Sequence, residues 1–135
     1  MENNIRWIQR FNNFSSALSL MQKFIDKGDE LNELENQGLI KSFEYNYELA
    51  WNTIKDFYEN QGETGIQGSK DAIQLAFKRG LIADGDVWME MLKDRNKSAH
   101  TYNEQLAEEL IEVIFVDYFP QFKLIQATLK KLIDK

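Results

Sequence analysis

The N-terminal segment, residues 1–27, constrains the fold most strongly, because its large apolar side chains recur every three or four positions. The spacing is 4, 3, 4, 3 and 4 along the series Trp7, Phe11, Phe14, Leu18, Met21 and Ile25. In an α-helix, residues three and four apart share one face, whereas in a strand alternate residues do. The segment is therefore predicted to be a long amphipathic helix that buries this stripe against other helices.

A second long helix is expected after Gly28, which interrupts the first. Its stripe is Ile40, Phe43, Tyr47, Ala50, Ile54 and Phe57, widened by Leu39, Trp51 and Tyr58, and it ends at Gly62. A shorter third helix should begin with Ser69 as N-cap and end at Gly80, with Ile73, Ala76 and Phe77 as its apolar face.

Two further helical segments complete the chain. The fourth begins near residue 84 and buries Val87, Trp88, Met91 and Leu92. The last runs from about Thr101 to the end, and Pro120 should bend or interrupt it near Tyr118. Its inward residues are expected to be Leu106, Leu110, Val113, Ile114, Leu124, Ile125, Leu129 and Leu132. The predicted fold is all-α: one domain over residues 1–135, an antiparallel up-and-down four-helix-type bundle with a short helical insertion and a kinked C-terminal helix.

Composition narrows the classes of function. Cysteine is absent, which excludes disulfides, thiolate metal sites and cysteine nucleophiles and is compatible with the cytoplasm, where we expect the protein. The N-terminus lacks the pattern of a signal peptide, and no apolar run approaches the roughly 18–20 residues that span a bilayer. The formal charge of −6 disfavours non-specific binding to nucleic acid, so an RNA-binding role requires a local basic site or a partner.

The stretch "MLKDRNKSAHTYNEQL", residues 91–106, holds the chain's single histidine. Arg95 continues the inward stripe of the fourth helix, three residues after Leu92. Thr101 and Glu104 have the spacing of a capping box, which places His100 just before a helix and Tyr102 in its first turn. A helix start and an arginine fork both favour a phosphate group, and a neutral histidine there could act as a base. The alternative is structural: His100 caps a turn and Arg95 makes an ion pair.

The segment "RNKSAHTY" resembles the R-x-x-x-x-H-x-Y motif of HEPN domains, in the branch also described as nucleotidyltransferase substrate-binding subunits. The similarity extends to "FEYNYELAWNTIKDFYENQG" and "SKDAIQLAFKRGLIADGDVWMEMLKDRN", and it covers most of the chain from about Phe43. This resemblance implies a toxin of a two-gene toxin–antitoxin system, paired with a minimal nucleotidyltransferase encoded by a neighbouring gene.

The resemblance also implies roles for individual residues. Arg95 and His100 would form a metal-independent endoribonuclease site, which cleaves RNA through its own 2′-hydroxyl. Asn96 would be the supporting polar residue, and Tyr102 would be adenylylated by the partner. A homodimer would bring two copies of the motif into one cleft, and no cofactor or metal is expected.

Two other functions stay open at this point. The bundle could be a non-catalytic substrate-binding subunit of a two-component nucleotidyltransferase, with the same groove as a recognition site. It could also be a plain helical interaction module whose motif is structural. Growth arrest on expression of the protein alone distinguishes the toxin from both.

Overall fold

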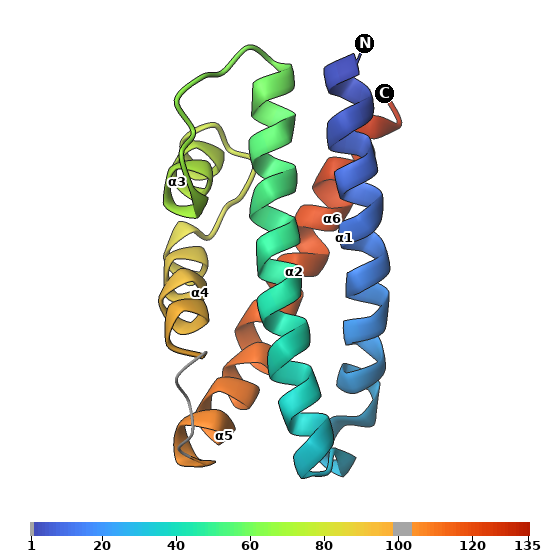
Figure 1. Ribbon diagram of the computed structural model, residues 1–135, viewed down its shortest axis with the longest axis vertical. Helices are drawn as coiled ribbons and strands as arrows, with labels where there is room; N and C mark the ends of the chain where they lie inside the picture. The colour runs from blue at the N-terminus through green and yellow to red at the C-terminus, as the bar shows by residue number, and fades with distance from the viewer. Residues whose placement is uncertain (1, 99–103) are drawn as a thin grey trace.

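The structure is a computed structural model, and it describes residues 2–98 and 104–135 (Figure 1). The helices in order are α1 (Glu2–Lys27), a 3-10 turn (Gly28–Glu30), α2 (Glu33–Asn60), α3 (Ser69–Lys78), α4 (Gly85–Ser98), α5 (Glu104–Val113), a π-helical turn (Ile114–Tyr118) and α6 (Phe119–Ile133). The described residues contain no strand, and the predicted all-α class is confirmed.

Helices α1 and α2 form a long antiparallel hairpin that runs the length of the molecule (Figure 1). The short α3 and α4 lie end to end beside α2. Helices α5 and α6 cross behind the hairpin on a diagonal, so that the C-terminus lies near the N-terminus (Figure 1). This is the bundle, with its helical insertion, that the apolar spacing predicted.

The core is built from aromatic rings contributed by several helices of the bundle. Phe122 of α6 is fully buried and meets Phe14 of α1 edge-on at a centroid distance of 6.1 Å and Trp88 of α4 at 5.9 Å. Phe43 of α2 stacks on Tyr118 at 5.3 Å. Edge-to-face and offset contacts of this kind stabilise a core beyond the burial of their area. They fix α4 and the π-helical turn against the rest of the bundle.

Local signals in the sequence set the helix ends. Asn32 and Glu35 form a capping box at the start of α2, in which each side chain accepts a hydrogen bond from the other residue's backbone N–H. Gly80 ends α3 with φ of +79°, and the Leu81 N–H donates to the Ala76 carbonyl at 2.8 Å. Positive φ is accessible to glycine without strain, so the predicted C-terminal glycine is confirmed.

The predicted N-cap of α3 is wrong by one residue. Gly68 holds the N-cap position, and Ser69 is already the first helical residue. The start of α3 is instead tied by Asp71, whose carboxylate accepts the Gln67 N–H at 3.0 Å. An acidic residue in the first helical turn is favourable for the same dipole reason as a cap.

Three residues predicted to face inward are exposed: Phe77, Leu106 and Leu124, at 54%, 49% and 59%. Phe77 lies on α3, which is covered on one side only, and its ring rests on Gly85. Leu124 comes one residue before the buried Ile125 and so points about 100° away from the stripe. Leu106 shares a face with Leu110 but lies a turn nearer the start of α5, where the described helices cover it only in part.

Pro120 acts where it was expected to act. It lies in the first turn of α6, directly after the π-helical turn. Proline has no N–H to donate to the carbonyl four residues earlier, which belongs to Val116 within that turn. The wider turn accommodates the missing bond and gives the C-terminal helix its interruption. Across the part of the chain that the structure describes, no helix is long and apolar enough to cross a membrane.

Candidate functional site

The last two turns of α4 carry the first part of the motif on the inward face. Trp88 and Met91 are fully buried, and Arg95 follows them on the same stripe. The indole N–H of Trp88 donates to Gln121 of α6 at 3.3 Å, which fixes the helix against the C-terminal segment. The prediction that Arg95 continues the stripe is confirmed, because its side chain is only 29% exposed.

The Arg95 guanidinium lies between α4 and α2, against Glu48. Its Nε is buried and forms an ion pair with Glu48, whose Oε1 lies at 3.3 Å, without a hydrogen bond between the two. The other carboxylate oxygen of Glu48 accepts the indole N–H of Trp51 at 2.9 Å. The carboxylate is thus held from both sides. The alternative expectation of an ion pair at Arg95 is met as well, and the pair belongs to the site.

Tyr47 lies next to this pair in the interior, one residue before Glu48. Its side chain is buried, and burial raises the pKa of Tyr47 to about 12. Ser69 at the start of α3 and the positive charge of Arg95 act in the opposite direction. The hydroxyl therefore stays protonated at neutral pH, as a dipole beside the guanidinium. Because Ser69 and Arg95 both act on Tyr47, the start of α3 lies near the same part of the interior as Arg95.

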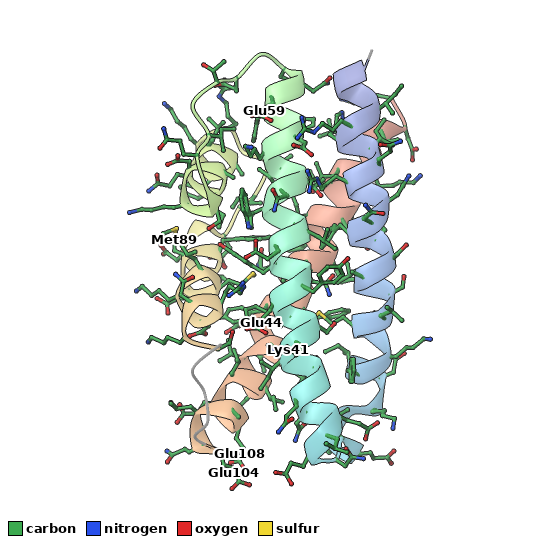
Figure 2. The ribbon with its side chains drawn as sticks, viewed as in Figure 1. Lys41, Glu44, Glu59, Met89, Glu104 and Glu108 are labelled. Atoms are coloured by element: carbon green, nitrogen blue, oxygen red, sulfur yellow. The ribbon has the colours of Figure 1, made fainter. Side chains whose placement is uncertain are left out.

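The end of α4 has a second tie to α2, one turn further along. The Ser98 hydroxyl donates to the Glu44 carboxylate, whose other oxygen lies 3.3 Å from Lys41 Nζ. Lys41 and Glu44 lie on α2 at the level where α4 ends (Figure 2). Glu44 and Glu48 are four residues apart and so share one face of α2. Through this face, Glu44 contacts Ser98 and Glu48 contacts Arg95, and the two contacted residues are three apart on α4.

A third tie comes from the π-helical turn. The Tyr118 hydroxyl donates to the carboxylate of Asp94, the residue before Arg95. Tyr118 is 2% exposed, and its pKa is raised, first by burial and then by the hydrogen bond to the Asp94 carboxylate. π-helical turns are often found at functional sites, where they displace a side chain from the regular register. Here the π-helical turn places Tyr118 against the C-terminal end of α4, which carries the motif.

The structure locates two of the four predicted site residues. Arg95 is half-buried toward α2, whereas Asn96, the next residue, is exposed. His100 and Tyr102 lie outside the described residues. Sequence reasoning missed Glu48, Asp94 and Tyr118. Only the first had a signal, since Glu44 and Glu48 are carboxylates at helical spacing along the edge of an apolar stripe.

The chemistry available from the described residues is that of an anion site. A guanidinium is a planar fork of N–H donors that suits a bidentate contact with phosphate or carboxylate. Within residues 2–98 and 104–135, no group of three histidine, cysteine, aspartate or glutamate residues could hold a metal ion. The described part of the site thus supplies a positive charge and no obvious acid or base, and His100 is the residue of the motif that could supply one.

Comparison with known proteins identifies the group to which this arrangement belongs. The family described as nucleotidyltransferase substrate binding protein like matches residues 9–131. A protein named probable ribonuclease HepT from Haemophilus influenzae is 34% identical over 74 residues, which cover 52% of this chain and 51% of the relative. The chain thus spans about half the length of the curated relative that it matches.

A crystal structure of a protein from Thermus thermophilus has the same fold. Its TM-score is 0.74 at 27% identity, over 88% of this chain and 98% of that one. The family match covers most of the chain, including Arg95 and the residues that follow it. The chain is therefore a HEPN-domain protein of the nucleotidyltransferase substrate binding protein-like family.

Proposed function

We propose that the protein is a metal-independent ribonuclease and the toxin of a two-gene pair. The observation that carries the proposal is the placement of Arg95. Arg95 lies on a helical stripe and pairs with Glu48 of α2, five residues before the only histidine of the chain. The neighbouring Asp94 and Ser98 tie the same helix end to Tyr118 and to Glu44. A relative named as a probable ribonuclease supports the same class of activity.

In the proposed reaction, His100 acts as base and removes the proton of an RNA 2′-hydroxyl. The resulting oxygen attacks the adjacent phosphorus, and the bond to the 5′-oxygen of the next nucleotide breaks. The products are a 2′,3′-cyclic phosphate and a 5′-hydroxyl, so the leaving oxygen needs a proton from an acid. Arg95 stabilises the charge on the non-bridging oxygens. Since one chain has one histidine, a homodimer would supply the second as acid.

Control of this activity would depend on Tyr102, two residues after His100. A partner nucleotidyltransferase would transfer AMP from ATP to the phenol oxygen and release pyrophosphate (AMPylation). The new phosphodiester anion would then compete with RNA phosphate for Arg95. Tyr102→Phe should stay active as a nuclease and resist neutralisation. Mass spectrometry after incubation with the partner, ATP and magnesium should locate the AMP adduct on a peptide that contains Tyr102.

The test of the nuclease is cleavage of RNA by the purified protein and by three variants. Arg95→Ala and His100→Ala should abolish cleavage and growth arrest while circular dichroism shows unchanged helical content. Arg6→Ala is the matched control, because Arg6 is 63% exposed on α1 and lies far from α4 in sequence. A chelator should have no effect on the wild type. Loss of activity in chelator, or full activity of His100→Ala, would contradict the proposal.

A second candidate function is a non-catalytic substrate-binding subunit for the nucleotidyltransferase. The name of the family and the formal charge of −6 favour it. In that case the protein alone should cleave no RNA and arrest no growth, yet it should form a complex with the partner. Arg95→Ala should then weaken binding of an anionic substrate to the complex. Light scattering of the isolated protein adds a further criterion, since only the ribonuclease requires a dimer.

A further inference from the structure

We propose that Glu48 is the positioning residue for Arg95, which it orients toward the RNA phosphate at the expense of some affinity. The proposal rests on the proposed ribonuclease function. Glu48 lies on α2, 47 residues before Arg95 in the sequence. The fold alone brings the two together.

The carboxylate of Glu48 is fixed before it meets the arginine. Trp51, three residues later on α2, donates its indole N–H to Glu48 Oε2 at 2.9 Å. Indole rings of this kind are stiff, with two rotatable bonds, so the carboxylate has little freedom although it is 41% exposed. Oε1 then lies 3.3 Å from Arg95 Nε. The order of contacts is Trp51 to Glu48 to Arg95.

The contact at Nε determines what the guanidinium can do. Nε is buried and makes no hydrogen bond, so its contact with Glu48 is electrostatic, and the edge with the two terminal nitrogens is the one that would have to meet a ligand. That edge matches two phosphate oxygens. A carboxylate beside the cation also cancels part of its attraction for a polyanion. Glu48 should therefore raise the turnover of bound RNA while it weakens ground-state binding.

An ordinary structural role for Glu48 predicts something different. Ion pairs that are partly exposed contribute little to stability, so the pair has no strong folding role to explain it. If Glu48 only filled space beside α4, its isosteric amide would behave as the wild type. The two roles differ in kinetics, where positioning affects kcat and uniform binding affects KM.

The experiment compares Glu48→Gln with Glu59→Gln. Both remove one negative charge from α2, and Glu59 lies at the far end of that helix, where it pairs with Lys55 at 3.8 Å (Figure 2). We expect Glu48→Gln to lower kcat by about 10- to 100-fold without raising KM, because small misplacements of a charge-stabilising group cost that much. Trp51→Phe should lower kcat in the same direction by less. Glu59→Gln should match the wild type.

Equal kcat in Glu48→Gln and Glu59→Gln would overturn the proposal, and so would a rise in KM at constant kcat. A readout without RNA separates this outcome from failure of the ribonuclease function. The Arg95 Nε–H signal in nitrogen-15 NMR should exchange faster with water in Glu48→Gln than in Glu59→Gln. If the wild type cleaves no RNA, the proposed function fails. If the Arg95 signal is the same in both variants, the positioning role fails.

Discussion

Removal of the Tyr118 hydroxyl should loosen the end of α4 that carries the motif. Tyr118→Phe keeps the ring, and therefore the stacking on Phe43 at 5.3 Å, and deletes only the donor to Asp94. The substitution isolates one hydrogen bond between the π-helical turn and the residue before Arg95. It therefore tests whether the hydrogen bond from Tyr118 to Asp94 contributes to the stability of the folded protein.

The magnitude follows from the surroundings of the two groups. Hydrogen bonds to charged partners contribute about 1.5–3 kcal/mol, and Tyr118 is 2% exposed, so nothing replaces its hydroxyl inside the core. Asp94 is half-buried and can recover water on its open side. We therefore expect the lower end, about 1.5 kcal/mol, which for a domain of this size lowers Tm by roughly 4–8 °C. Asp94→Asn keeps an acceptor and should cost less.

Urea unfolding followed by circular dichroism measures this difference directly. Tyr45→Phe is the matched control, because it removes a phenol hydroxyl from a side chain on α2 that is 59% exposed. The control should stay within about 0.5 kcal/mol of the wild type. The double variant Asp94→Asn with Tyr118→Phe should cost less than the sum of the two. Equal stability of Tyr118→Phe and Tyr45→Phe would refute the role of the hydrogen bond.

Four further results are expected. Burial raises the pKa of Tyr47 from its usual value of about 10 to about 12 in the folded state. The protonated phenol therefore contributes its full stabilisation below about pH 10, and this contribution is lost as the pH rises to 12. The urea midpoint of the wild type should fall across that window, and that of Tyr47→Phe should fall less steeply. Asp56→Ala should cost about 1.5–3 kcal/mol in the same assay, because this buried carboxylate accepts a hydrogen bond from Arg10 at 2.9 Å and pairs with Arg6. Phe77→Ser should cost less than about 1 kcal/mol, whereas Phe122→Ala should cost about 3–5 kcal/mol, and the reverse order would contradict the assigned core. Lys97→Ala should weaken RNA binding for all sequences and reduce the salt slope by about 1, measured by fluorescence anisotropy with His100→Ala as background.

The helices could be predicted from the sequence because burial on one face leaves a period. The stripe from Trp7 to Met21 is buried as its spacing requires, and Gly28 and Gly80 end their helices with positive φ. Pro120 marked the interruption before α6. The inward position of Arg95 followed from the same count. These features depend on local geometry alone.

The partners of Arg95 could not be predicted in the same way. Periodicity says which face of a helix is buried, and says nothing of the height at which a neighbouring helix crosses it. The pairing of Arg95 with Glu48 depends on where α4 stops beside α2. The bond from Tyr118 to Asp94 depends further on the π-helical turn, which shifts the register by one residue. The inward position predicted for Phe77 was wrong for a related reason, because the rest of the bundle covers only one side of α3.

The net charge of −6 matters to the proposed RNA-cleaving site only through the charges that lie near it. Among the described residues near the end of α4, Glu48 pairs with Arg95 and Glu44 with Lys41, whereas Asp94 accepts a hydrogen bond from the neutral Tyr118 hydroxyl and keeps its negative charge. Glu104 and Glu108 lie in the first turns of α5, which directly follows the motif in the sequence, and they add negative charge there (Figure 2).

At physiological salt, charges act over about 8 Å, so the local set decides the attraction for a phosphate. The cations on α4 are Arg95, Lys93 and Lys97, and they are offset by Asp94 on the same helix, by Glu90, which lies 3.2 Å from Lys93, and by Glu48 beside Arg95. So few cations bind RNA weakly, because the affinity grows with the number of neutralised phosphates. A second copy of the chain in the proposed homodimer would double these cations in the same cleft that gains the second histidine. The carboxylates beside these cations are doubled as well, so the proposed assembly rests on the need for a second histidine as acid.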